Sequence, residues 1–248
     1  MYVLEARGLS RDFGGFKAVA NVDFGLVEGS IHAVIGPNGA GKTTLFNLLT
    51  KFLPPTGGTI LHKGEDVTRL SPPAMARRGV VRSFQISAVF AGLTVRENVE
   101  LALLNAHGLA WNLFGSLARR PALKRAAEEM IERFGLSTYL EARAGNLPYG
   151  RKRALELATT LALDPAVLLL DEPMAGLGHE DIDKVSSLVR EAGRGRTILL
   201  VEHNMRVVSD LADTITVMVR GEKLAEGTYA EVSARPDVIA AYTGGAHV

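Results

Sequence analysis

Residues 36–43 read GPNGAGKT, a pattern of glycines, one lysine and one threonine that suits phosphate binding. The glycines let such a loop curl without side-chain clash, so that successive backbone N–H groups point inward at a phosphate. Lys42 adds a positive charge, the Thr43 hydroxyl is a suitable ligand for Mg²⁺, and Thr44 lies close enough to help hold the phosphates. The pattern predicts a binding site for a nucleoside triphosphate.

A pair of carboxylates, Asp171 and Glu172, directly follows the apolar run VLLL at 167–170. Such a run is typical of a buried strand, and ligands of open α/β sheets bind at the carboxyl ends of strands. We expect Asp171 to hold Mg²⁺ through water and Glu172 to polarise the attacking water. His203 follows another apolar run, TILLV at 197–201, and this position at a neighbouring strand end puts it near the γ-phosphate.

The elements that must position these residues alternate along the chain. Short β-rich runs occupy 2–9, 18–27, 30–35, 58–62, 80–84, 167–170, 197–201 and 214–219. Helical spacing occurs at 42–49, 94–104, 121–134 and from about 150 onward. The first two runs predict antiparallel strands, and the last three, with helices between them, predict a parallel α/β sheet. Thr94 and Glu97 have capping-box spacing, which predicts a helix start.

The bulk composition is that of an ordinary globular protein. The chain has 248 residues, of which 47% are hydrophobic and 22% charged. The 28 basic and 27 acidic residues leave a formal charge of +1, which gives no overall attraction to nucleic acid or anionic lipid. The sequence has 0 Cys, no secretion signal at its start and apolar runs of strand length, so we expect a soluble, cytoplasmic protein.

The middle of the chain is helical and lacks buried strands. We therefore expect residues 88–160 to form an inserted helical subdomain. Residues 1–87 and 161–248 would form the nucleotide-binding core together with an antiparallel β subdomain.

Taken in order, these motifs resemble the nucleotide-binding subunit of ABC transporters over essentially the full length of the chain. GPNGAGKT is similar to the Walker A motif of that family, and VLLLDE is similar to Walker B. Gln85, in RSFQ, falls at the Q-loop glutamine, and His203, in VEHN, falls at the switch histidine. Phe13, in DFGG, resembles the aromatic residue that stacks on adenine, with Phe16 as a less suitable substitute.

The resemblance implies a set of site residues. The implied nucleotide-binding residues are Phe13, Asn38, Gly39, Ala40, Gly41, Lys42, Thr43, Thr44, Tyr149 and Gly150. The implied Mg²⁺ ligands are Thr43, Gln85 and Asp171, and the implied catalytic residues are Glu172, His203 and Gln85.

The family signature, L-S-G-G-Q, is matched only in part by NLPYGRKRA at 146–154. Leu147 and Gly150 agree with it, whereas Pro148, Tyr149 and Arg151 replace Ser, Gly and Gln. In the family this motif opens a helix whose N-terminus touches the γ-phosphate bound by the opposite subunit. Proline is tolerated near a helix start because the N–H that it lacks would be free there. The serine hydroxyl is lost, and Arg151 could offset that loss by a charge-assisted contact.

A second departure lies at 175–178, where AGLG replaces the usual S-A-L-D and Gly178 stands for an aspartate that links the two ATP sites. Both departures resemble one branch of the family, the cassettes of branched-chain amino acid importers. The insertion with ARRPALKR at 118–125 and the C-terminal stretch ARPDVIAAYTGG at 234–245 are similar to that branch as well. We interpret ARRPALKR itself as a solvated helix face.

The resemblance implies an α/β fold, with a P-loop NTPase (RecA-like) core, an N-terminal antiparallel β subdomain and the inserted helical subdomain. It implies Mg²⁺ and ATP as cofactors, and hydrolysis of ATP that energises import of branched-chain or related amino acids. The implied partners are the permease subunits in the membrane, a second ATP-binding subunit and, indirectly, a periplasmic or extracellular substrate-binding protein, with no nucleic acid. The subunit would be peripheral on the cytoplasmic face of the inner membrane.

Other functions remain open. The cargo could be urea or another small amide, or the chain could be the cassette of lipopolysaccharide export, because cargo is chosen by other subunits. ABC-type ATPases of DNA repair or chromosome structure need long coiled coils or zinc modules, against which 0 Cys and no sustained heptads argue. Translation-factor relatives carry two cassettes in one chain. A weakly catalytic scaffold subunit would account for Pro148 and Gly178, but the intact motifs disfavour it.

The apolar stretch ISAVFAGLTV at 86–95 follows Gln85 directly. Its side chains Val89, Phe90 and Leu93 have little sequence pattern to bury them internally. We expect them to be exposed as a docking groove for a short cytoplasmic helix of the membrane subunit. The alternative is that they pack under the helical insert, as short apolar runs often do.

Overall fold

The computed structural model describes residues 1–83, 89–106 and 121–243. The chain divides into two compact units. The core unit comprises Met1–Arg82, Ala166–Glu172 and Gly193–Val248, and the helical unit comprises Ser83–Pro165 and Pro173–Ala192. The structure groups Pro173–Ala192 with the helical residues, whereas the boundaries expected from sequence kept this segment in the core.

Four strands of the core unit form an antiparallel sheet. They are β1 (Tyr2–Phe13), β2 (Phe16–Val27), β4 (Gly57–His62) and β5 (Glu65–Asp66), in the order β2-β1-β4-β5. The predicted antiparallel pairing of the first two strands is confirmed. Both strands are longer than the predicted runs at 2–9 and 18–27. Their hairpin closes with Phe13 paired to Phe16, which places both aromatic residues at its tip.

The second sheet of the core unit has six strands. They are β3 (Ile31–Ile35), β6 (Val80–Arg82), β7 (Val167–Asp171), β8 (Thr197–Val201), β9 (Thr214–Val219) and β10 (Glu222–Gly227), in the order β10-β9-β3-β8-β7-β6. The neighbours from β9 to β6 are parallel, and β10 is antiparallel to β9. Strands β3, β7 and β8 are buried along their whole length, as continuous apolar runs in a parallel sheet require.

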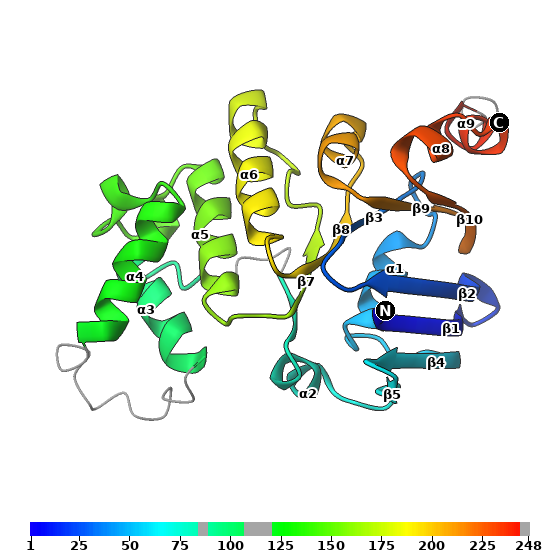
Figure 1. Cartoon of the computed structure of the whole chain (residues 1–248), viewed down its shortest axis with the longest axis horizontal. Helices are drawn as coiled ribbons and strands as arrows, with labels where there is room; N and C mark the ends of the chain where they lie inside the picture. The colour runs from blue at the N-terminus through cyan, green and yellow to red at the C-terminus, as the bar shows by residue number, and fades with distance from the viewer. Residues whose placement is uncertain (84–88, 107–120, 244–248) are drawn as a thin grey trace. The chain divides into compact units, whose positions relative to one another are not determined.

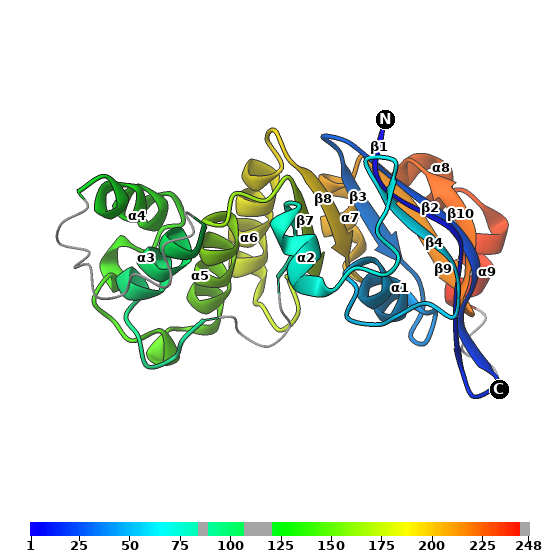
Figure 2. The same ribbon diagram turned by 90° about the horizontal axis from the view of Figure 1, so that it is seen from below.

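Helices cover both faces of this six-stranded sheet. They are α1 (Lys42–Leu49), α2 (Pro72–Arg77), α7 (Met205–Leu211), α8 (Tyr229–Ser233) and α9 (Pro236–Thr243). Val34 and Met218 join the cluster that contains α1 and the antiparallel sheet, whereas Ile35 and Val217 join the cluster that contains α7, α8 and α9. This alternation is the two-residue period of a strand. In Figure 1, α7, α8 and α9 gather on one side of the sheet, and both views place α1 beside its strands (Figures 1 and 2).

The helical unit contains four helices and two short 3₁₀ turns among its described residues. They are α3 (Val95–Ala106), α4 (Pro121–Arg133), Ser137–Tyr139, Ala144–Asn146, α5 (Tyr149–Leu161) and α6 (His179–Ala192). The predicted capping box is confirmed: the Thr94 N–H donates to Glu97 Oε2 at 2.7 Å, and the Glu97 N–H donates to Thr94 Oγ1 at 3.1 Å. None of the helices built from described residues is both long and apolar enough to cross a membrane.

Candidate functional site

The loop GPNGAGKT joins the end of β3 to the start of α1, the strand–loop–helix context that a phosphate site needs. Two of its glycines are required by close backbone approaches. A Cβ on Gly36 (φ 152°) would lie 2.2 Å from the Met218 carbonyl oxygen, and one on Gly41 (φ 95°) would lie 2.3 Å from the Ala18 carbonyl oxygen. The loop is therefore held between β9 and β2, with its amides at the N-terminus of α1.

Lys42 begins α1 and folds back over the loop that precedes it. Its Nζ donates to the Gly36 carbonyl oxygen at 2.7 Å and to the Pro37 carbonyl oxygen at 2.9 Å. Burial lowers the pKa of Lys42, and the negative charges of Glu172 and Asp171 act in the opposite direction. The Lys42 ammonium group is therefore close enough to both carboxylates for electrostatic attraction, as their sequence motifs predicted.

Asp171 is the last residue of β7 and is 3% exposed. Its Oδ2 accepts from Arg82 Nη2 at 3.0 Å, whereas its buried Oδ1 has no hydrogen-bond partner among the described residues. Burial raises the pKa of this carboxyl group, and the positive charge of Arg82 opposes that rise. A buried carboxylate oxygen without a donor suits a hard cation or its water, so Asp171 fits the Mg²⁺ role expected of it.

Within the part of the chain that the structure describes, no three His, Cys, Asp or Glu side chains gather as a metal cluster. Thr43, the other described candidate ligand, is exposed in the first turn of α1.

Glu172 follows β7 with φ 46°, a left-handed conformation that costs energy for a residue other than glycine. Its N–H donates to the Val201 carbonyl oxygen of β8 at 2.9 Å, which holds this conformation in place. The side chain is half-buried. A strained backbone at a carboxylate beside a phosphate loop is typical of a functional position.

His203 lies in the short connection between β8 and α7, and its side chain is exposed. The buried Glu202 side chain accepts from the backbone N–H groups of His203, at 3.1 Å, and Asn204, at 3.3 Å. Asn204 then caps α7 by accepting from the Arg206 and Val207 N–H groups. The backbone on both sides of His203 is thus fixed, although its imidazole is open to solvent.

The remaining candidates for nucleotide contact differ in exposure. Asn38 and Gly39 are exposed, Thr44 is half-buried, and Ala40 is buried. Phe13 is 46% exposed, and the Arg11 guanidinium lies 4.6 Å from the centre of its ring. The role of Phe13 in adenine stacking stays a prediction, and Gln85 lies outside the described residues.

In the helical unit, the LPYG segment forms the start of α5, with Pro148 at the N-cap position. Gly150 is buried, and a Cβ there would lie 2.5 Å from the Asp181 carboxyl carbon, so a larger residue would have to displace the Asp181 side chain. The Tyr149 hydroxyl donates to the Ala175 carbonyl oxygen at 3.1 Å. A Cβ on Gly176, at φ 75°, would lie 3.4 Å from the Tyr149 ring. The two segments that depart from the family pattern, LPYG and AGLG, therefore contact each other.

Arg151 points to its own unit in this structure. Its Nη1 donates to the Gly135 carbonyl oxygen at 3.3 Å, and its guanidinium lies 6.0 Å from the centre of the Tyr139 ring. The phosphate contact suggested for Arg151 stays a prediction, and it would require this side chain to leave both neighbours.

The expectation for Val89 is wrong, because this side chain is only 7% exposed. Phe90 is 59% exposed, as expected, and Leu93 is half-buried. The buried Asn98 side chain explains the difference. It accepts from the Phe90 N–H at 2.8 Å and donates to the carbonyl oxygens of Phe90, at 3.1 Å, and Thr94, at 2.8 Å. This clamp holds the loop so that Phe90 alone projects fully.

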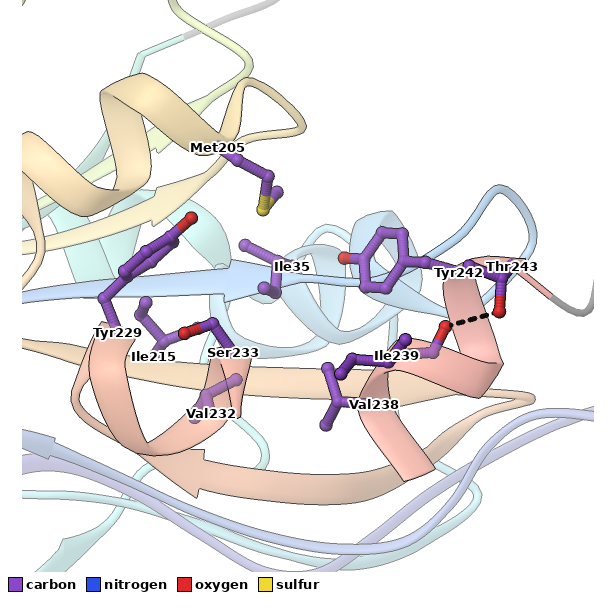
Figure 3. Close-up of a pocket in the computed structure, with 10 residues that line it drawn as sticks. All are labelled: Ile35, Met205, Ile215, Tyr229, Val232, Ser233, Val238, Ile239, Tyr242 and Thr243. Carbon is purple, nitrogen blue, oxygen red and sulfur yellow. Dashed lines mark hydrogen bonds between the residues drawn. The ribbon is translucent and has the colours of Figure 1, made fainter. Parts of the chain in front are cut away.

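A cavity of about 320 Å³ lies in the core unit between α7, α8, α9 and β9 (Figure 3). Its lining is almost wholly apolar and includes Ile35, Met205 and Ile239. Burial raises the pKa of Tyr242, which lines this cavity, to about 12. No candidate catalytic residue lines this cavity, so it is not the phosphate site.

Comparison with known proteins gives a consistent relationship. The family model for ABC transporters matches residues 19–175, and that for branched-chain amino acid ATP-binding cassette transporters matches residues 222–248. The high-affinity branched-chain amino acid transport ATP-binding protein LivG of Escherichia coli K12 is 42% identical, with 98% of each chain covered. BraF of Pseudomonas aeruginosa, which bears the same description, is 40% identical at the same coverage.

Solved structures agree with these sequence relationships. A nucleotide-free ATP-binding cassette from an ABC transporter has a TM-score of 0.84 and 28% identity, and covers 98% of this chain and 99% of its own. A cassette in its ADP conformation has a TM-score of 0.83 and 29% identity at the same coverage. With a family match across most of the chain, the same fold and a phosphate loop facing two carboxylates, the chain belongs to the ABC transporter family, as one of its ATP-hydrolysing cassettes.

Proposed function

We propose that this chain energises the import of branched-chain or related amino acids. The observation that carries the proposal is the 42% identity to LivG along 98% of both chains, because it includes the helical unit and the C-terminal helices as well as the shared ATP motifs. The match of residues 222–248 to the branched-chain amino acid cassettes supports the same cargo.

In the proposed mechanism, the amides of the loop and Lys42 bind the β- and γ-phosphates, which replace the two carbonyl oxygens that Lys42 now contacts. Thr43, Gln85 and Asp171 would hold Mg²⁺, which supplies charge neutralisation at the phosphates. Glu172 would accept a proton from the attacking water and orient it toward the γ-phosphorus. His203 would stabilise the charge that develops on the γ-phosphate oxygens.

We propose further that two cassettes pair head to tail around ATP, with Tyr149 and Gly150 of one facing the γ-phosphate held by the other. Lys42 and Gly150 belong to different units of the chain, so each unit would serve a different nucleotide. The N-terminus of α5 offers its free amides and the positive end of its dipole to such a phosphate. The second cassette would be another copy of this chain or a sister cassette.

The permease subunits would dock at Phe90, on the cytoplasmic face of the inner membrane, with a substrate-binding protein acting through them. Asp at position 90 places a charge in that contact, and Phe90 is already 59% exposed, so the substitution should leave folding and basal ATPase activity intact. We expect Phe90→Asp to abolish co-purification with the permease subunits. Ile239→Asp, at a 50% exposed site on α9, is the matched control and should assemble normally. An F90D protein that assembles as well as I239D would move the docking site elsewhere.

Cargo is tested by reconstitution in proteoliposomes with candidate permease and binding-protein subunits. We expect leucine-loaded binding protein to stimulate ATP hydrolysis and leucine uptake, and Glu172→Gln to abolish both. Stimulation by urea or another small amide, with none by leucine, isoleucine or valine, would reject the proposed cargo while leaving the ATPase role intact.

A further inference from the structure

The sequence motifs assign no role to Arg82, yet among the described residues its side chain forms an ion pair with Asp171. It is the last residue of β6, and Nη2 lies 3.0 Å from Asp171 Oδ2 at the end of the adjacent strand β7. The two side chains are 11% and 1% exposed, respectively. Ion pairs at this depth are little screened by solvent and hold a defined geometry.

The other arm of the guanidinium reaches the phosphate-loop helix. Arg82 Nη1 donates to Asn47 Oδ1, and Asn47 lies in α1, which begins with Lys42. The guanidinium carbon also lies 4.8 Å from the centre of the Phe46 ring and 5.4 Å from that of the Phe52 ring. One side chain thereby links the helix of the phosphate loop to the strand that ends in Asp171.

These contacts set the orientation of the Asp171 carboxylate. Its Oδ2 is committed to Arg82, whereas its buried Oδ1 has no hydrogen-bond partner among the described residues. A guanidinium has planar, forked donors, so it can bond Asp171 and Asn47 at once and resist rotation of either. A lysine in its place would offer a charge without this fork.

We propose that Arg82 is a positioning residue for the metal of Mg·ATP: it holds one oxygen of Asp171 so that the other stays available to Mg²⁺ or its water. The inference rests on the proposed metal role of Asp171. Arg82 would thus align Asp171 with the phosphate loop without touching the nucleotide.

The test is the gain in nucleotide affinity that Mg²⁺ provides. The full chain is titrated with the fluorescent, non-hydrolysable nucleotide mant-AMP-PNP, once with Mg²⁺ and once with EDTA, and the ratio of the two Kd values is compared among variants. We expect Arg82→Met to lower this ratio about tenfold, which corresponds to ~1.4 kcal/mol, while its Kd in EDTA stays near that of the wild type. Arg82→Lys should recover part of the ratio, because it restores the charge but not the fork.

Arg78→Met is the matched control. Arg78 also pairs with a carboxylate, Glu65, at 2.6 Å, but this pair is exposed and lies away from the phosphate loop. Its ratio should equal that of the wild type. Should Arg82→Met fail to fold, Asn47→Ala removes only the second arm and should lower the ratio about threefold.

Asp171→Asn separates the two hypotheses. If it loses the Mg²⁺ effect while the Arg82 and Asn47 variants keep it, the positioning role is wrong and the metal role of Asp171 stands. A larger ratio in Arg82→Met would also overturn the inference, because Arg82 would then compete with the metal. If Asp171→Asn itself keeps the full effect, the proposed metal role fails first.

Discussion

At the scale of single residues, Lys42 is held by hydrogen bonds to the loop that precedes it. Its Nζ donates hydrogen bonds to the carbonyl oxygens of Gly36 and Pro37, which fold the loop around the lysine ammonium group. His203, by contrast, is exposed on a backbone that Glu202 and Asn204 hold. We propose that the two residues act at different stages, Lys42 in binding ATP and His203 as charge develops on the γ-phosphate.

This difference predicts opposite kinetic signatures. Lys42→Ala should weaken ATP binding by at least about tenfold, because a charge-assisted contact to the ground-state phosphates is lost. His203→Ala should keep the wild-type Kd within about twofold and lower turnover roughly 100-fold, because its contact strengthens mainly in the transition state. Nucleotide binding by calorimetry and phosphate release under single-turnover conditions separate the two effects. Equal loss of affinity in both variants would contradict this division of roles.

At the scale of elements, the start of α5 and the turn before α6 are joined by Tyr149. Its hydroxyl donates to the Ala175 carbonyl oxygen at 3.1 Å, and its ring lies over Gly176. Tyr149 of LPYG therefore packs against Gly176 of AGLG. A side chain at position 176 would contact the Tyr149 ring. A residue without a hydroxyl group at position 149 would lose the hydrogen bond to the Ala175 carbonyl oxygen.

Tyr149→Phe should therefore loosen the AGLG turn. Losing one hydrogen bond of about 1 kcal/mol should speed amide hydrogen exchange at 175–178 about fivefold, measured by mass spectrometry. Tyr139→Phe is the matched control in the same unit, because Tyr139 faces Arg151 instead of the turn. Unchanged protection of the turn in Tyr149→Phe would show that the contact does not hold it.

Strand β3, which leads into the phosphate loop, carries a buried histidine. His32 Nε2 lies 2.8 Å from Thr216 Oγ1, and the Thr216 hydroxyl donates to Glu226 at 2.9 Å, so Nε2 is the donor to Thr216. Burial lowers the pKa of His32 from 6.5 to about 4; the charge of Glu226 opposes this and that of Lys223 adds to it. Between these two pH values the unfolded chain binds the proton better than the native protein, so acid destabilises the fold.

We expect this histidine to cost about 2 kcal/mol of unfolding free energy between pH 7.5 and pH 5, on top of other groups. The stability that it contributes is complete above its unfolded pKa of 6.5 and is lost as the pH falls toward about 4. Urea unfolding at the two pH values measures it. His32→Gln keeps a donor for Thr216 but cannot titrate, so it should show a smaller acid loss. The same loss in both proteins would place the acid sensitivity elsewhere.

Much of the element structure could be predicted because it depends on local pattern. Helix α1 starts and ends where its spacing indicated, and the capping box at Thr94 begins α3. Strand β10 was missed because EKLAEG is an edge strand with little apolar alternation. Helix α8 was missed although Thr228 and Glu231 form a capping box, the same local signal that begins α3. Helix α9 was missed although Pro236 and Asp237 stand in its first turn, which is a helix-start pattern. The pair of Arg82 with Asp171 joins residues 89 positions apart in the sequence, so no local spacing could predict it.

At the scale of the whole molecule, the residues expected to contact ATP are divided between the two units of the chain. The core unit carries the phosphate loop, Asp171, Glu172 and His203, and the helical unit carries Tyr149 and Gly150. Each unit has its own buried core, with Phe46 in the first and Leu155 in the second. Because the expected contact residues belong to different units, we propose that each nucleotide-binding site is completed by residues of a second subunit.

Sedimentation velocity of the Glu172→Gln protein, alone and with candidate permease and cassette subunits, tests this pairing most directly. This variant should bind Mg·ATP without hydrolysing it, because the carboxylate that accepts the proton is gone. With Mg·ATP the 26.6 kDa chain should sediment as a pair of cassettes, and Lys42→Ala in the same background should abolish pairing. A Glu172→Gln chain that binds ATP yet stays at the mass of one cassette under every condition would contradict the shared site.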